Sequence, residues 1–385
     1  MTEALKKHYE WKGKIEIRSK VKLDTLDDLS LAYTPGVADA CLAIKDNPEL
    51  SYSLTGRGNQ VAVITDGSAI LGLGNIGPIA GMPVMEGKSV LFKEYGGIDA
   101  IPLCINSNDV DEIVRTVKLL EGNFAGINLE DISAPRCFEV ETRLKKELNI
   151  PVFHDDQHGT AICVGAALIN ALKIVNKKIE DVTVSMSGAG AAGTAICKYL
   201  IKMGVKNVIV SEMNKIINRD EKYPNKNKNE LAMITNKDNI KGDLSDAMRG
   251  SDVFVGVSAG NIVTIDMVKS MAKDSIVFAL ANPISEINYN DAKKAGAKVV
   301  GTGSSKYPNQ VNNALVFPGL FRGAIDAKAS DITFDMMKAA SLAISSMIKD
   351  EELNETNLLP KVIDKEVHKR IALKVKEAWK ENVII

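Results

Sequence analysis

Residues 187–193 read Ser187-Gly188-Ala189-Gly190-Ala191-Ala192-Gly193, a Gly-x-Gly-x-x-Gly pattern. An apolar strand candidate at 181–187 precedes the pattern, and a helix candidate at 191–203 follows it. In such a turn the first glycine allows a tight bend, the second lets a pyrophosphate approach the backbone, and the third lets the helix pack closely on the strand. The helix N-terminus also favours phosphate. Residues 188–193 are therefore predicted to bind a dinucleotide, with a merely tight strand–helix turn as the alternative.

Strand and helix candidates continue to alternate after this turn. Further strand candidates lie at 207–212, 252–258, 275–282 and 298–303, and the helical segments between them lie at 244–249, 266–272 and 290–295. This alternation is typical of a parallel sheet with helices on its faces. The predicted fold class is α/β, with a Rossmann-type doubly wound parallel sheet that binds NAD(P).

The segment before this domain has strand candidates of its own, at 60–65, 125–129 and 151–154, and a helix candidate near 110–120. A chain of 385 residues also exceeds what one hydrophobic core usually supports. We therefore expect an N-terminal α/β substrate domain at 1–158 and a nucleotide-binding domain with C-terminal helices at 159–385. A helix candidate at 159–176 would bridge them, and clefts between domains often hold active sites.

Charge and cysteine content narrow the possible partners and compartment. The 48 basic and 49 acidic residues nearly cancel, so neither nucleic acid nor an anionic membrane is an expected partner. The five cysteines are scattered without a Cys-x-x-Cys pair, which favours buried free thiols over disulfides or zinc. The N-terminus lacks the apolar core of a signal peptide, and the longest apolar stretch, at 161–172, is too short to cross a bilayer. We predict a cytoplasmic protein.

Acidic pairs follow two of the N-terminal strand candidates: Glu130 and Asp131 end the run at 125–129, and Asp155 and Asp156 end the run at 151–154. Carboxylates at strand ends can converge, and three oxygen ligands suit Mg²⁺ or Mn²⁺. Either pair could instead be a solvated strand end or a helix cap. His154 and His158 flank the second pair, and we interpret both as structural hydrogen-bonding residues.

The end of the strand at 207–212 bears on the choice of dinucleotide. Glu212 there can accept hydrogen bonds from the adenosine ribose hydroxyls, although an exposed carboxylate is the simpler interpretation. Its charge would repel a 2′-phosphate, so NAD is the first choice. Lys215 and Arg219 lie just beyond and could receive that phosphate, which leaves NADP possible.

Taken together, the segments resemble the malic enzyme family in its short bacterial and archaeal form. The matching stretches are 13–15, 29–38, 65–74, 81–88, 127–132, 153–161, 281–283 and 312–319. The resemblance implies oxidative decarboxylation of L-malate to pyruvate and CO₂ with reduction of NAD or NADP. It also implies a divalent metal, decarboxylation of oxaloacetate as a side activity, and a homodimer.

The resemblance also implies roles for single residues. Tyr33 and Lys88 on their own would be a packed aromatic residue and a solvated loop lysine, but they match the family's general acid and general base. The remaining matches are the metal ligands Glu130, Asp131 and Asp156, the lysine-supporting Asp155, the substrate-binding Asn282 and Asn313, and the dinucleotide turn of Gly188, Ala189, Gly190, Ala191, Ala192 and Gly193. Glu212 and Asn282 are expected to contact the cofactor as well.

One departure concerns the substrate carboxylate. The longer eukaryotic enzymes have an arginine before the Leu-Gly-Leu-Gly motif, whereas this chain has Ala69, preceded by Ser68. Ser68 and nearby backbone amides are therefore the expected donors.

To act as a general base, the Lys88 amine must be neutral, so its pKa must be lowered. Burial and a nearby metal would both lower its pKa. The competing hypotheses are a 2-hydroxy-acid dehydrogenase without decarboxylation and a nucleotide-sensing protein that has lost its chemistry.

Overall fold

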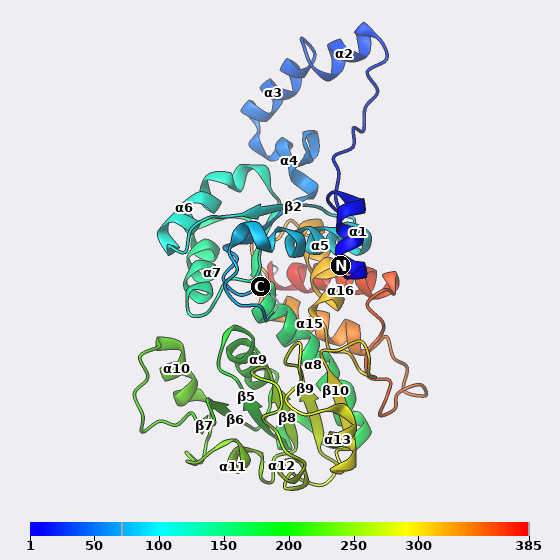
Figure 1. Cartoon of the computed structure of the whole chain (residues 1–385). Coiled ribbons are helices and arrows are strands. Elements are labelled where there is room, and N and C mark those ends of the chain that lie inside the picture. Colours follow the sequence, from blue (N-terminus) through cyan, green and yellow to red (C-terminus); the bar gives the residue numbers. More distant parts are fainter. Residues whose placement is uncertain (71, 384–385) are drawn as a thin grey trace.

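Two separate sheets form the body of the protein, and a long helix, α8 (Asp155–Val175), leads from the first to the second (Figure 1). The computed structural model describes residues 1–70 and 72–383. Leu71, inside the predicted 65–74 motif, and the last two residues of the predicted second domain lie outside this description. The predicted α/β class is confirmed, since neighbouring strands pair in parallel in both sheets with a single antiparallel exception among the described pairs.

The first sheet has the strand order β2-β1-β3-β4. Its strands are β1 (Gln60–Thr65), β2 (Asp99–Cys104), β3 (Gly126–Leu129) and β4 (Val152–His154). The sequence analysis missed β2, an edge strand whose side chains are mostly half-buried. Its helices are α5 (Pro78–Gly96), α6 (Val110–Leu120) and α7 (Arg136–Glu147). Apolar residues of α6 and α7 pack with those of the sheet into one core.

The second sheet has the order β10-β9-β8-β5-β6-β7. Its strands are β5 (Thr183–Ser187), β6 (Asn207–Glu212), β7 (Lys215–Ile216), β8 (Val253–Gly256), β9 (Ile276–Ala279) and β10 (Val299–Thr302). Its helices are α9 (Ala191–Lys202), α10 (Lys226–Ile234), α11 (Leu244–Met248), α12 (Ile265–Lys269) and α13 (Tyr289–Lys294). The order reverses on either side of β5, and ligands bind beyond the carboxyl ends of strands at such a point.

Helix α8 begins four residues earlier than the predicted start at 159, so Asp155 and Asp156 form its first turn. By length and by the mean hydropathy of 1.5 in one of its windows, the helix is long and apolar enough to cross a membrane, although the apolar stretch predicted at 161–172 is shorter than the helix. However, 72% of its most apolar window is buried inside the protein. The helix therefore serves as a core helix against which α9 and α15 (Phe334–Ser345) pack.

The C-terminal helices α14 (Phe317–Asp326) and α16 (Lys365–Val383) pack on α5 of the first sheet. The Phe92 ring lies 4.7 Å from that of Phe317 and 5.3 Å from that of Phe321, measured between centroids. Residues that follow the second sheet in the chain therefore complete the core of the first. The predicted division at 158/159 falls inside α8 and stays a prediction.

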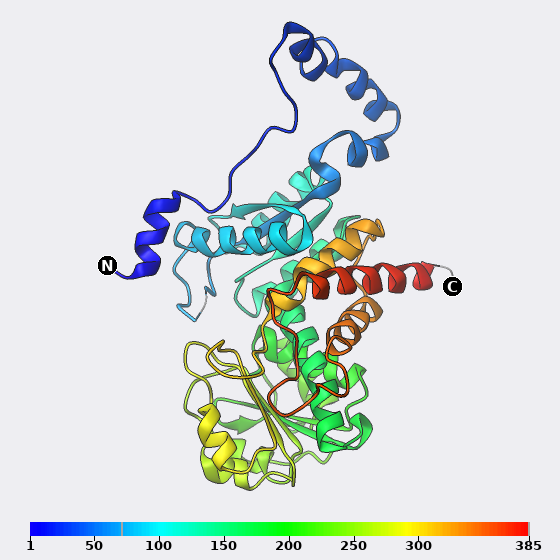
Figure 2. The same cartoon turned by 90° about the vertical axis from the view of Figure 1, so that its right-hand side faces the viewer.

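The first 54 residues form an arm with the helices α1 (Glu3–Trp11), α2 (Leu26–Ala32), α3 (Val37–Asp46) and α4 (Ser51–Leu54). Helices α2 and α3 project away from both sheets (Figures 1 and 2). Within the described chain none of the four helices has a buried residue, and Leu26 and Leu31 are 84% and 76% exposed. The arm buries little apolar surface in its own chain.

All five cysteines are free. Cys137, Cys163 and Cys197 are buried as expected, but Cys41 is exposed on the arm and Cys104 is half-buried. The prediction of buried thiols is thus wrong for Cys41, because the arm has no core in its own chain.

The aromatic contact between the two parts of the chain makes a prediction about stability. Phe321 is fully buried between Phe92 and Phe153, so Phe321→Ala should lower the free energy of unfolding by about 3–5 kcal/mol. Leu342→Ala on α15, at a side chain that is 47% exposed, should change it by no more than about 0.5 kcal/mol. Chemical unfolding of both variants measures this, and equal small losses would contradict the packing role of Phe321.

Candidate active site

Three carboxylates meet at the carboxyl edge of the first sheet. Glu130 and Asp131 directly follow β3, and Asp156 lies in the first turn of α8 directly after the neighbouring strand β4. Each offers one oxygen, and these oxygens all lie within 4.8 Å of one another. Glu130 and Asp131 are buried, whereas the Asp156 side chain is 31% exposed. The structure thus brings together the three predicted metal ligands.

The donor set fits a hard divalent cation. It consists of carboxylate oxygens from three residues, which is the chemistry that Mg²⁺ and Mn²⁺ prefer. Burial raises the pKa of Glu130 to about 7 against the attraction of Lys88, as expected when like charges crowd in a poorly solvated site. A cation between the three carboxylates would relieve this repulsion.

Lys88 lies beside these carboxylates on helix α5 and is buried, so its interpretation as a solvated loop lysine is excluded. Its Nζ is 2.5 Å from Asp155 Oδ2 and 2.8 Å from Glu130 Oε1, and it lies 4.1 Å from the centre of the Phe317 ring. Burial opposes the lysine charge, but attraction by Asp155 and Glu130 outweighs it and raises the pKa of Lys88. The expected fall in this pKa is therefore wrong for the protein without a metal.

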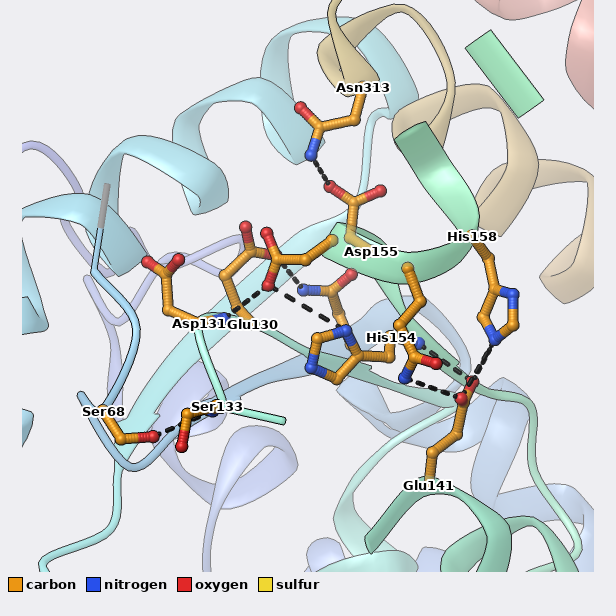
Figure 3. A network of polar contacts seen from close by, with 12 residues as sticks. Ser68, Glu130, Asp131, Ser133, Glu141, His154, Asp155, His158 and Asn313 are labelled. Carbon is orange, nitrogen blue, oxygen red and sulfur yellow. Dashed lines mark hydrogen bonds and ion pairs between the residues drawn. The ribbon is translucent and has the colours of Figure 1, made fainter. Parts of the chain in front are cut away.

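Asp155 links the lysine to the C-terminal part of the chain. Its Oδ2 accepts a hydrogen bond from Lys88 Nζ. The same oxygen accepts a second hydrogen bond, at 2.6 Å, from the side-chain amide of Asn313 (Figure 3). Asn313 opens a short 3₁₀ turn (Asn313–Leu315) that leads into α14. Burial raises the pKa of Asp155 to about 7, against the attraction of Lys88. Asn313 thus reaches the site by contacting Asp155, and its substrate role stays a prediction.

The structure places Tyr33, the predicted acid, apart from Lys88 and the carboxylates. Tyr33 ends helix α2 on the projecting arm, and its side chain is 68% exposed. Figures 1 and 2 both show α2 at the far end of the arm, away from α5, and α5 is the helix that carries Lys88.

Ser68 is buried, and its hydroxyl is engaged in the loop after β1. It donates to Asp66 Oδ1 at 2.5 Å and accepts from the Ser133 backbone amide at 2.9 Å. Asp66 in turn pairs with Arg136 at 2.9 Å. Figure 3 shows Ser68 and Ser133 together below Asp131. The contacts hold the loop that carries Asp131, and a role for Ser68 in binding substrate stays a prediction.

Of the two histidines next to the acidic pair, only His158 shows the predicted hydrogen-bonding role, because neither ring nitrogen of His154 has a hydrogen-bond partner among the described residues. His158 Nε2 donates to the carboxylate of Glu141 at 2.9 Å. His154 is fully buried, and burial lowers its pKa to about 4, which keeps it neutral. The sequence analysis missed Glu141 as a partner. Its signal was present, because Glu141 falls on the buried face of α7 with Cys137, Val140 and Leu144, where the helical period predicts apolar residues.

The glycine-rich turn has the predicted form. Gly188 has a φ of 108°, and a side chain at Gly193 would collide with the Gly188 carbonyl oxygen. A Cβ at Gly190, the residue before α9, would meet no described atom within 4 Å, so a ligand can approach the backbone there. A cavity of about 530 Å³ adjoins the turn. Its lining includes Ser187, Gly188, Ala189, Gly190, Glu212, Asn214 and Ser258.

Glu212 lines this cavity and forms an ion pair with Lys228 of α10. The two cations proposed for a 2′-phosphate are engaged elsewhere: Lys215 pairs with Glu221 at 2.8 Å, and Arg219 donates to the Lys237 carbonyl oxygen at 2.8 Å. The sequence analysis missed Lys228, because only the fold brings α10 beside the end of β6.

Asn282 is exposed in the loop after β9. The buried carboxylate of Glu286 holds this loop beside the cavity, since it accepts hydrogen bonds from the backbone amides of Ser258 at 2.9 Å and Ala281 at 3.1 Å. The expected contacts of Asn282 with cofactor and substrate stay predictions.

A dinucleotide-binding sheet joined to a buried lysine and a cluster of carboxylates defines an NAD(P)-dependent oxidoreductase. The family model for the malic enzyme N-terminal domain matches residues 12–110 and 105–145, and the model for the malic enzyme NAD-binding domain matches 157–379. The chain belongs to the malic enzyme family.

Relatives and solved structures agree with this. The chain is 55% identical over 366 residues to the NAD-dependent malic enzyme of Geobacillus stearothermophilus, covering 95% of this chain and 76% of the relative. It is 52% identical to the bifunctional malic/malolactic enzyme of Bacillus subtilis, covering 99% and 93%. The crystal structure of the NAD-dependent malic enzyme of Thermotoga maritima matches with a TM-score of 0.94 at 47% identity, covering 98% of this chain and 99% of that one.

Proposed function

We propose that this chain catalyses the oxidative decarboxylation of L-malate to pyruvate and CO₂ with reduction of NAD or NADP, using a divalent metal ion. The observation that carries the proposal is the buried Lys88 between Glu130 and Asp155, beside the carboxylates of Asp131 and Asp156. Decarboxylation of added oxaloacetate would be a side activity. All five cysteines are free, which supports a reducing compartment such as the cytoplasm.

The site would hold both the metal and the cofactor. Mg²⁺ or Mn²⁺ held by Glu130, Asp131 and Asp156 would polarise the substrate oxygens and neutralise the carboxylates, and NAD(P) at Gly188–Gly193 would supply the hydride acceptor. Asn282 and Asn313 would bind the substrate carboxylate, together with Ser68 or the backbone amides near it. Because burial already excludes water from Lys88 and Asp155, a proton can move between them without solvent.

Lys88 would be the general base for the C2 hydroxyl group. In the protein without a metal the raised pKa keeps the Lys88 side chain as a charged ammonium group. It must therefore release a proton before it can act as a base. Asp155 Oδ2 is the nearest acceptor at 2.5 Å, and its raised pKa of about 7 brings its proton affinity closer to that of the amine. Asn313 holds the same oxygen in place. Asp155 would therefore support the lysine by accepting its proton, and Tyr33 would later protonate C3.

The reaction itself can be tested by its stoichiometry. With L-malate, Mn²⁺ and NAD or NADP, we expect equal amounts of reduced cofactor, pyruvate and CO₂, and removal of the metal by a chelator should abolish all three. Oxaloacetate without CO₂ would instead indicate a plain 2-hydroxy-acid dehydrogenase. Cofactor binding without turnover under any divalent metal would indicate a sensor. Lactate should be assayed too, because the Bacillus subtilis relative is named a malic/malolactic enzyme.

A homodimer would resolve the position of Tyr33. The arm exposes Leu26, Leu31 and Tyr33 together, and an apolar surface of this kind usually marks a binding site for another protein surface. A two-fold dimer can exchange such arms reciprocally. We propose that the arm of one copy packs on the other copy and supplies Tyr33 to the site that contains the other copy's Lys88.

Mixing two inactive variants tests this arrangement. Tyr33→Phe and Lys88→Ala should each lose most malate oxidation, the latter by roughly 100-fold or more. After unfolding and refolding together, half of the dimers are mixed and one of their two sites has both residues, so about a quarter of the wild-type activity should return. If Tyr33 acts within its own chain, every site carries one substitution and the mixture stays inactive.

For the cofactor, we propose that Glu212 binds the ribose and makes NAD the preferred substrate. Its pairing with Lys228 weakens the preference, because the lysine offsets part of the charge that would repel a 2′-phosphate. The relatives include enzymes named for NAD and enzymes named for NADP, so NADP stays possible as the cofactor. The chain is 46% identical to the NADP-dependent malic enzyme of Escherichia coli, but it spans only 45% of that protein.

Substitution of Glu212 and substitution of Lys228 should change the preference for NAD over NADP in opposite directions. Glu212→Ala should narrow the gap in kcat/KM between NAD and NADP, because it removes the repulsion and frees Lys228. Lys228→Ala should widen it. Glu230 lies on the same helix as Lys228 and pairs with Lys198 of α9. Glu230→Ala is therefore the matched control and should leave the ratio unchanged. A ratio that is unaffected by Glu212→Ala would remove Glu212 from cofactor selection.

A further inference from the structure

Glu141 is a buried acidic residue for which the proposed reaction has no use. It lies on the inner face of α7 and is only 6% exposed. Its carboxylate accepts hydrogen bonds from the His154 backbone amide at 3.2 Å, from Gln157 Nε2 at 3.1 Å and from His158 Nε2 at 2.9 Å (Figure 3). A buried carboxylate is tolerated only with such compensation.

The three donors lie on both sides of Asp155 and Asp156 in the chain. His154 precedes them, and Gln157 and His158 follow. Glu141, on α7, therefore binds residues before and within the first turn of α8 through hydrogen bonds. Lys88 and Asn313 bind Asp155, in the same turn, through hydrogen bonds of their own. Among the described residues no side chain of its own caps the start of α8, and the bond to the His154 amide provides a partner from another helix for this helix start.

The charge of Glu141 suits this task. Burial alone would raise its pKa, but attraction by His158 and the hydrogen bond from it hold the pKa at about 2. The group is thus a carboxylate at neutral pH, and both oxygens accept hydrogen bonds. An amide in its place could accept with one oxygen only, and its NH₂ group would face other donors.

We propose that Glu141 is a positioning residue for the metal centre, which fixes the first turn of α8 so that Asp156 points at the oxygens of Glu130 and Asp131. The inference rests on the proposed function, since it assumes that these three carboxylates bind a divalent cation. Asp156 also accepts a hydrogen bond from the Asp131 amide at 2.7 Å, so a small rotation of the turn would disturb two ligands at once.

The test is a titration of Mn²⁺, followed by electron paramagnetic resonance, on the full chain without substrate. Partners that orient metal ligands typically contribute about 10–100-fold to metal affinity, so Glu141→Gln should bind Mn²⁺ that much more weakly. NAD affinity should be unchanged, because the glycine-rich turn lies in the other sheet. Saturating Mn²⁺ should restore part of the lost kcat.

A matched control separates positioning from general stability. Glu286→Gln changes another buried carboxylate, which holds two backbone amides beside the nucleotide cavity. It should leave Mn²⁺ affinity unchanged. Equal weakening in Glu141→Gln and Glu286→Gln would show a general loss of packing and overturn the inference.

The outcomes also separate the inference from the proposed function. If wild-type protein and Asp156→Asn bind Mn²⁺ equally poorly, the proposed metal site itself is wrong. If wild type binds and Glu141→Gln binds as tightly, only the positioning role is wrong. Should Glu141→Gln fail to fold, His158→Asn removes one of the three donors and keeps the carboxylate. It should weaken Mn²⁺ binding by a smaller factor, and unchanged binding would overturn the role of Glu141.

Discussion

The buried contact of Lys88 with Asp155 and Glu130 is the constraint on which the rest of the structure depends. It joins α5, the end of β3 and the start of α8 at a point with little solvent. Breaking such a contact leaves a buried charge without compensation, which is strongly destabilising. The three segments therefore have to meet in register, and the parallel pairing of β3 with β4 sets that register. Lys88, Glu130 and Asp155 thus stabilise the fold and also form the proposed active site.

Much of this arrangement follows from local sequence. The turn at Gly188–Gly193 could be predicted because each glycine meets a separate steric requirement of a turn between a strand and a helix. The convergence of Glu130 and Asp131 with Asp156 is readable because carboxyl ends of neighbouring parallel strands meet at one edge. The residues that join these elements were harder to find. Strand β2 is mostly apolar in sequence, but it carries Pro102, and a proline within such a run argues against a strand.

Other features could not be predicted because they depend on distant parts of the chain. The pKa of Lys88 is raised by two carboxylates that lie 42 and 67 residues away in sequence, and burial alone predicts the opposite sign. Lys228 reaches Glu212 only because α10 returns to the end of β6. Glu141 did leave a local signal, a charge on the buried face of an amphipathic helix, yet its three hydrogen-bond donors could be identified only from the fold.

The two sheets and the arm carry different groups of the proposed active site. Oxidation requires the nucleotide and the proposed base to come together. Helix α8 connects the two sheets within a single chain, because its first turn carries Asp155 and Asp156 while its body packs against α9. The two sheets and α8 therefore carry the proposed base and the proposed metal ligands. Tyr33 lies on a segment with no core of its own among the described residues, and in the arrangement that we propose a second copy of the chain positions it. The acid would then be in place only after assembly, and the complete proton-transfer pair would be a property of the dimer.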